Sequence, residues 1–66
     1  MAVIQISRRS QFSARIIWSF EGEEAIFEIF ETELETFQVD HGFQDMEWPT
    51  LEIAVSFVTE WLENHS

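Results

Sequence analysis

Glutamates concentrated between residues 21 and 35 are the residues of this sequence with the clearest chemical potential. Seven of these fifteen positions are glutamate, and none is lysine or arginine. They are Glu21, Glu23, Glu24, Glu28, Glu31, Glu33 and Glu35. Carboxylates at this density can steer a basic partner protein toward the surface. They can equally serve only to keep a small, aromatic-rich domain dispersed in water.

Catalytic chemistry finds little support in the other residues. The sequence has no cysteine, and its only histidines are His41 and His65, the latter next to the last residue. A nucleophilic mechanism needs a nucleophile, a base and a group that orients the base. The only glycines are Gly22 and Gly42, too few for a glycine-rich phosphate-binding loop. We therefore predict that the protein is not an enzyme and has no catalytic residues.

Residues 40–47 contain side chains of the types that bind metal ions. These are Asp40, His41, Asp45 and Glu47. Their spacing is not that of a calcium-binding EF-hand loop, and short mixtures of histidine and carboxylate are common by chance. We therefore predict no metal site and no cofactor.

The overall charge limits the partners that the protein can bind. Thirteen aspartates and glutamates stand against three arginines and no lysine, which gives a formal net charge of −10. A field of this sign disfavours direct contact with nucleic acid or an anionic membrane, so we expect a basic or neutral protein partner. The arginines all lie in the first quarter of the chain. We expect them to pair with nearby glutamates; a contact between opposite patches of two copies is the alternative.

The chain is near the lower size at which one hydrophobic core can hold a fold. Its 66 residues predict a single domain, residues 1–66, without disulfides because cysteine is absent. An apolar content of 45% with seven phenylalanines and three tryptophans is far above that of disordered acidic chains. Because so small a domain cannot easily bury all these rings, we expect some at a partner surface or in a homodimer contact. The sequence has no evident signal peptide or membrane-spanning stretch, so we expect a soluble cytoplasmic protein.

The segment before the glutamates has the alternation of a half-buried strand. Apolar side chains recur there at every second position: Phe12, Ala14, Ile16, Trp18 and Phe20. The glutamate-rich segment that follows is compatible with a helix over residues 23–37 or with a second strand. A two-residue turn at Glu21-Gly22, in which glycine supplies a positive φ, favours the second strand because of the pairing that it produces. With this turn, apolar residues lie opposite each other on one face of a hairpin: Trp18 and Ala25, Ile16 and Phe27, and Ala14 and Ile29.

On the other face, the same register places Arg15 opposite Glu28. We therefore favour the hairpin, and the helix remains the alternative. Residues 36–39 alternate again and predict a third strand. Val3-Ile4-Gln5-Ile6 predicts a short edge strand, with a turn at residues 7–10.

The C-terminal segment predicts a helix. Pro49 precedes it, Thr50 can cap its first turn, and Glu52 lies where the helix dipole favours negative charge. Apolar residues cover a wider arc of this helix than packing on one sheet requires. The surplus, which needs a second cover from a curled sheet or another subunit, is Ile53, Phe57 and Trp61.

These patterns together predict an α+β fold, a small antiparallel β-meander of three or four strands with one C-terminal helix packed on it (β-β-β-α). The favoured function is a non-enzymatic inhibitor or regulator that presents the seven glutamates to a basic site of a partner, as small acidic DNA mimics of phages and mobile elements do. That analogy is one of size and charge. The alternative is a structural or adaptor subunit whose charge serves only solubility. It would bind a partner or itself through apolar side chains: Ile53, Phe57 and Trp61 on the helix, and Ile17, Ile26 and Phe30 on the outer sheet face.

Overall fold

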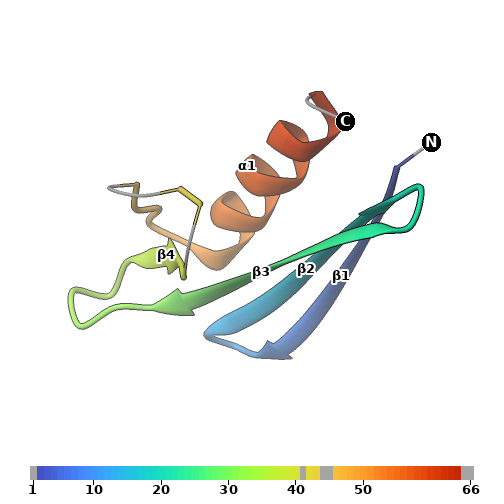
Figure 1. The fold of residues 1–66 in the computed structure, drawn as a ribbon. Coiled ribbons are helices and arrows are strands. Elements are labelled where there is room, and N and C mark those ends of the chain that lie inside the picture. Colours follow the sequence, from blue (N-terminus) through green and yellow to red (C-terminus); the bar gives the residue numbers. More distant parts are fainter. Residues whose placement is uncertain (1, 41, 44–45, 65–66) are drawn as a thin grey trace.

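The computed structural model describes residues 2–40, 42–43 and 46–64, which form an antiparallel sheet with one helix packed on it. The sheet order follows the chain, β1-β2-β3-β4. Figure 1 shows the helix lying across one face of this sheet. The elements are β1 (Val3–Ser10), β2 (Ser13–Phe20), β3 (Glu23–Glu31), β4 (Phe37–Val39) and α1 (Leu51–Asn64). The predicted α+β meander with a C-terminal helix is confirmed, with four strands.

The β2–β3 hairpin has the predicted register. Trp18 pairs with Ala25, and Arg15 pairs with Glu28. The turn residues Glu21 and Gly22 have φ values of 48° and 85°. Positive φ at both central residues is the pattern of a type I′ turn, whose twist matches that of the flanking strands. The alternative helix over residues 23–37 is therefore wrong, because cross-strand burial and this turn override the helix propensity of glutamate.

A second hairpin connects β3 to β4. The amide of Glu35 donates to the carbonyl of Thr32 at 3.1 Å, and the amide of Thr32 donates to the carbonyl of Thr36 at 2.7 Å. Glu35 has a φ of 61°, which completes the common three-residue loop with one left-handed position. The predicted third strand is confirmed, although it begins at Phe37 and not at residue 36.

Strand β1 is longer than the alternation predicted. It continues to Ser10, so the turn predicted at residues 7–10 is wrong and lies instead at residues 11–12. Phe12, predicted on the buried side of β2, is 53% exposed in that turn. Polar residues 7–10 stay in the strand because β2 offers them pairing partners, with Arg8 opposite Ala14. The register shifts between Arg8 and Ser10, which places an irregularity at Arg9.

Helix α1 begins as predicted. The amide of Ile53 donates to Thr50 Oγ1 at 3.1 Å, so Thr50 is the N-cap. Its buried residues are Leu51, Ala54, Val55, Val58 and Leu62. They pack in one core with the sheet residues Ala14, Ile16 and Ile29. Among the described residues, no helix combines the length and the apolar character that crossing a bilayer requires.

The segment between β4 and α1 covers part of the outer helix surface. Trp48 forms a bridge with Phe37, with backbone hydrogen bonds of 2.8 and 2.9 Å. Phe43 is 8% exposed, and its ring centroid lies 6.2 Å from that of Phe57 and 5.2 Å from that of Trp61. The second cover that the wide apolar arc of α1 requires is therefore supplied in part by the chain itself.

Candidate partner-binding surface

The seven predicted glutamates do not form one continuous patch. Three lie at the β2–β3 turn, and we call them the turn cluster: Glu21, Glu23 and Glu24. Three lie at the far end of β3 and in the next loop, and we call them the loop cluster: Glu31, Glu33 and Glu35. The eight residue steps of β3 from Glu23 to Glu31 separate the clusters by about 27 Å. The seventh, Glu28, lies between them.

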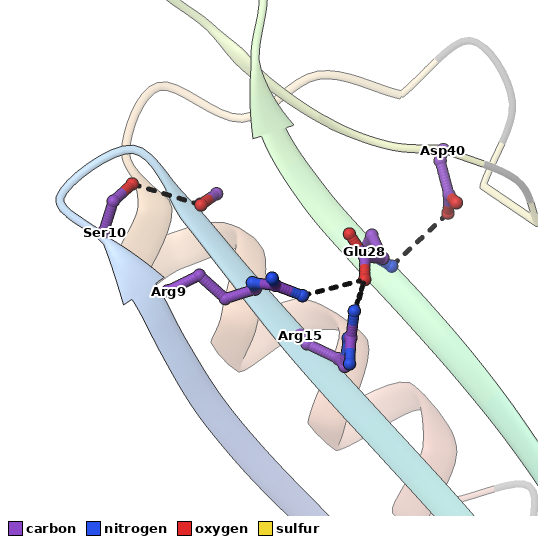
Figure 2. A network of polar contacts seen from close by, with 6 residues as sticks. Arg9, Ser10, Arg15, Glu28 and Asp40 are labelled. Atoms are coloured by element: carbon purple, nitrogen blue, oxygen red, sulfur yellow. Dashed lines mark hydrogen bonds and ion pairs between the residues drawn. The ribbon is translucent and has the colours of Figure 1, made fainter.

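Glu28 is held by two arginines on the sheet face opposite the helix (Figure 2). Arg15 Nε donates to Glu28 Oε1 at 2.6 Å, as the register predicted. Arg9 Nη1 lies 3.6 Å from the same oxygen. The Glu28 backbone is fixed as well, because its amide donates to Asp40 Oδ1 at 3.3 Å and its carbonyl accepts from the Asp40 amide at 3.0 Å. The centre of this face therefore carries two arginines beside the two carboxylates of Glu28 and Asp40, so its charges balance and interrupt the acidic surface.

The remaining arginine is also engaged. Arg8 Nη2 lies 3.2 Å from Oε1 of Glu52 in the first turn of α1. A hydrogen bond from the backbone amide of Glu52, followed by that from Arg8, holds the pKa of the Glu52 carboxyl below its ordinary value. Because the three arginines pair with Glu28 and Glu52, neither glutamate cluster has an ion pair with another described residue. The turn and loop clusters are therefore exposed carboxylates that a partner can reach.

The predicted apolar residues of α1 lie on its outer surface and are partly exposed. Ile53, Phe57 and Trp61 are 47%, 38% and 40% exposed. A shallow hollow of about 320 Å³ beside Ile53 and Phe57 is bordered by Glu52 and Glu60. This apolar strip therefore has carboxylates on its rim, so that contact with it also brings a partner close to negative charge.

The sheet face without the helix carries the other predicted apolar residues. Ile17 pairs with Ile26 across β2 and β3, and Phe30 pairs with Ser13. Ile26 and Phe30 are 40% and 39% exposed. The Arg15–Glu28 pair lies between these two levels of the ladder, so the apolar side chains are separated by charge.

A second hollow, of about 230 Å³, opens between the C-terminal half of α1 and the hairpin. It is lined by Trp18, Ala25, Phe27, Trp61 and Leu62. We call it the aromatic groove. The indole Nε1 of Trp18 is buried and has no hydrogen-bond partner among the described residues. The sequence placed Trp18 and Trp61 on apolar faces, but it did not indicate that both would line one groove.

The candidate metal ligands of residues 40–47 are used otherwise where the structure describes them. Asp40 binds the backbone of Glu28, and Glu47 accepts a hydrogen bond from Thr36 Oγ1. His41 and Asp45 lie outside the described residues. Within the described part of the chain, no three histidine, aspartate or glutamate side chains gather as a metal site would need.

Comparison of the chain with models of known protein families, with curated proteins and with solved structures found no match.

Proposed function

We propose that this protein is a non-enzymatic inhibitor or regulator that binds a basic site on another protein. The observation that carries the proposal is the distribution of ion pairs. The three arginines are used by Glu28 and Glu52, which leaves six exposed glutamates in the turn and loop clusters without a cationic partner among the described residues. Exposed carboxylates of this kind accelerate association with a basic surface and select against acidic ones.

A basic site that ordinarily holds nucleic acid is one target that this charge suits. Duplex DNA carries one negative charge per about 1.7 Å of axis, so the roughly 27 Å between the two clusters would span about 16 phosphates. The chain places there six glutamates that have no ion pair with another described residue, and two arginines near the middle. This density of negative charge is lower than that of DNA, so it favours contact with the partner at two separated points over imitation of a continuous row of phosphates.

The test begins with the native partner, isolated by affinity capture with the full chain and identified. Association rates are then measured over a range of ionic strength. We expect a steep loss of rate with added salt, and slower association after neutralisation of the two clusters by Glu→Gln changes. The matched control for each single Glu→Gln change is Glu60→Gln, which removes one charge from the outer surface of the helix. Binding that does not respond to salt would contradict the proposal.

The apolar strip on α1 supports a second candidate, an adaptor that binds a partner or a second copy through this strip. The supporting observation is the 47% exposure of Ile53. Ile53→Asp is the suitable probe because Phe57 and Trp61 contact Phe43 and their replacement would also disturb the fold. The adaptor predicts that Ile53→Asp breaks the complex or dimer while the circular dichroism spectrum is unchanged. An unaffected complex would count against it.

A further inference from the structure

We propose that the aromatic groove holds an arginine or lysine side chain from a basic segment of the partner protein. This inference rests on the proposed function and names the anchor of that interaction. The groove lies where the C-terminal half of α1 passes over β2 and β3, so that Trp61 and Leu62 of the helix face Trp18, Ala25 and Phe27 of the hairpin. In Figure 1, the C-terminal end of the helix lies toward the end of the sheet that carries the β2–β3 turn.

The size and lining of the groove suit one long cationic side chain. Its volume of about 230 Å³ is below the roughly 300–1,000 Å³ of sites for small-molecule ligands. Three of its five lining residues, Trp18, Phe27 and Trp61, are aromatic. The apolar stem of an arginine or lysine can pack against such rings, and tryptophan faces attract the charged end.

Among the described residues, the charged side chains at this end of the molecule are carboxylates, the sign that a cation requires. Glu23 pairs with Phe20 across the hairpin and lies two residues from Ala25, so it is on the same sheet face as the groove. The ring centroids of Trp18 and Phe20 are 6.2 Å apart, and Phe20 pairs with Glu23, so Phe20 lies between the groove and the turn cluster. The last turn of α1 contains no basic residue, so the negative end of the helix dipole adds to the field.

The buried indole of Trp18 supplies a further reason for an occupant. Within the part of the chain that the structure describes, its Nε1 has no hydrogen-bond partner, and a buried donor in this state is unfavourable. A peptide carbonyl of the bound segment would accept from this nitrogen once the lining of the groove moves to admit it. The indole N–H is also a local probe, because its nuclear magnetic resonance signal responds to a new acceptor or a nearby charge.

A second copy of this chain is a poor occupant. The cations that it could insert are its three arginines, and these are paired with Glu28 and Glu52. Two copies would also bring two chains of formal charge −10 together. A basic segment of another protein introduces neither difficulty.

The test uses an octa-arginine peptide as the probe and an octa-citrulline peptide, its neutral counterpart, as the control. Binding to the full chain is followed at low ionic strength through the indole N–H signals of Trp18, Trp48 and Trp61. We expect the charged peptide alone to move the signals of Trp18 and Trp61. Trp48 does not line the groove, so its signal is expected to move little. Ala25→Leu, which fills the groove without changing the charge, should remove the shifts at Trp18 and Trp61.

Two double variants separate the groove from general attraction between charges. Glu21→Gln with Glu23→Gln should weaken peptide binding about two- to thirtyfold, the range expected for losing two exposed ion pairs. Glu31→Gln with Glu33→Gln removes the same charge at the far end of β3 and should weaken peptide binding less.

Equal weakening by both pairs, without movement at Trp18, would overturn the groove while leaving charge-driven partner binding intact. Absence of peptide binding would also contradict the proposed occupant of the groove. The proposed function would then still be tested by the salt dependence of the native complex. Signals of Trp18 that move with protein concentration alone would assign the groove to a second copy and overturn the inference.

Discussion

The turn residue Glu21 provides a direct test of the hairpin geometry. Its φ of 48° places it in the left-handed region, and Gly22 follows with a φ of 85°. A left-handed conformation costs an ordinary residue about 1–2 kcal/mol, whereas asparagine tolerates it and Asn-Gly is the favoured pair for a type I′ turn. We therefore expect Glu21→Asn to raise the free energy of unfolding by about 1 kcal/mol. For a domain of this size, that gain corresponds to an increase in Tm of about 4–8 °C.

The matched control is Glu21→Gln, which removes the same charge but retains a side chain that is unfavourable at this backbone position. Thermal unfolding of both variants, followed by circular dichroism at several salt concentrations, separates the two causes. The backbone explanation predicts that the asparagine variant is clearly more stable than the glutamine variant at every ionic strength. An equal gain for both at low salt, lost as salt is added, would show that repulsion among the turn glutamates is the cause and would refute the backbone argument.

Three further variants test the helix and its cover. Phe43→Ala should cost about 3–5 kcal/mol, a large part of the roughly 3–10 kcal/mol of stability typical for this length. The midpoint of its urea unfolding should therefore fall well below that of the parent protein, and a native-like midpoint would contradict the central place of Phe43 among the aromatic rings. Thr50→Ala should cost about 1 kcal/mol by loss of the N-cap, seen as a lower Tm, and Thr50→Ser should restore it. Because the folded-state pKa of Glu52 is lowered, its stabilisation is present above its ordinary value of 4.5 and is lost as the pH falls below it. Glu52→Gln should therefore be less stable than the parent at neutral pH and equal to it in acid, as thermal melts over that pH range would show.

The hairpin register could be predicted because two independent signals agreed. Alternation fixed which residues of 13–20 face the core, and Gly22 fixed where the chain turns, so Arg15 and Glu28 had to be opposite each other. The helix was predictable for the same reason, since the cap at Thr50 coincides with the start of the apolar pattern. The extension of β1 to Ser10 was not predictable, because residues 7–10 are polar and their strand conformation depends only on the neighbouring strand.

The role of Phe43 was missed because it is a single aromatic residue in a segment without periodicity. Its burial arises from contacts with rings of two other elements, Phe27 of β3 and Trp61 of α1, whose proximity depends on the tertiary fold. The aromatic groove was missed for a similar reason, since Trp18 and Trp61 are far apart in the sequence. The position of Arg9 beside Glu28 also required the fold, because it depends on how β1 pairs with β2.

Backbone conformation connects the acidic clusters to the question of function. Among the described residues, the non-glycine residues with positive φ are Glu21 and Glu35, one in each cluster. Glycine or asparagine would be more stable at both positions, so stability of the fold does not explain these glutamates. Residues held in costly conformations often lie at functional sites, where another benefit offsets the cost. Glu21→Asn therefore tests both sides of this argument: if the carboxylate is retained for partner binding, the more stable variant should associate more slowly with a basic partner than the parent protein does. A variant that gains stability and loses no binding would leave solubility as the remaining reason for this glutamate.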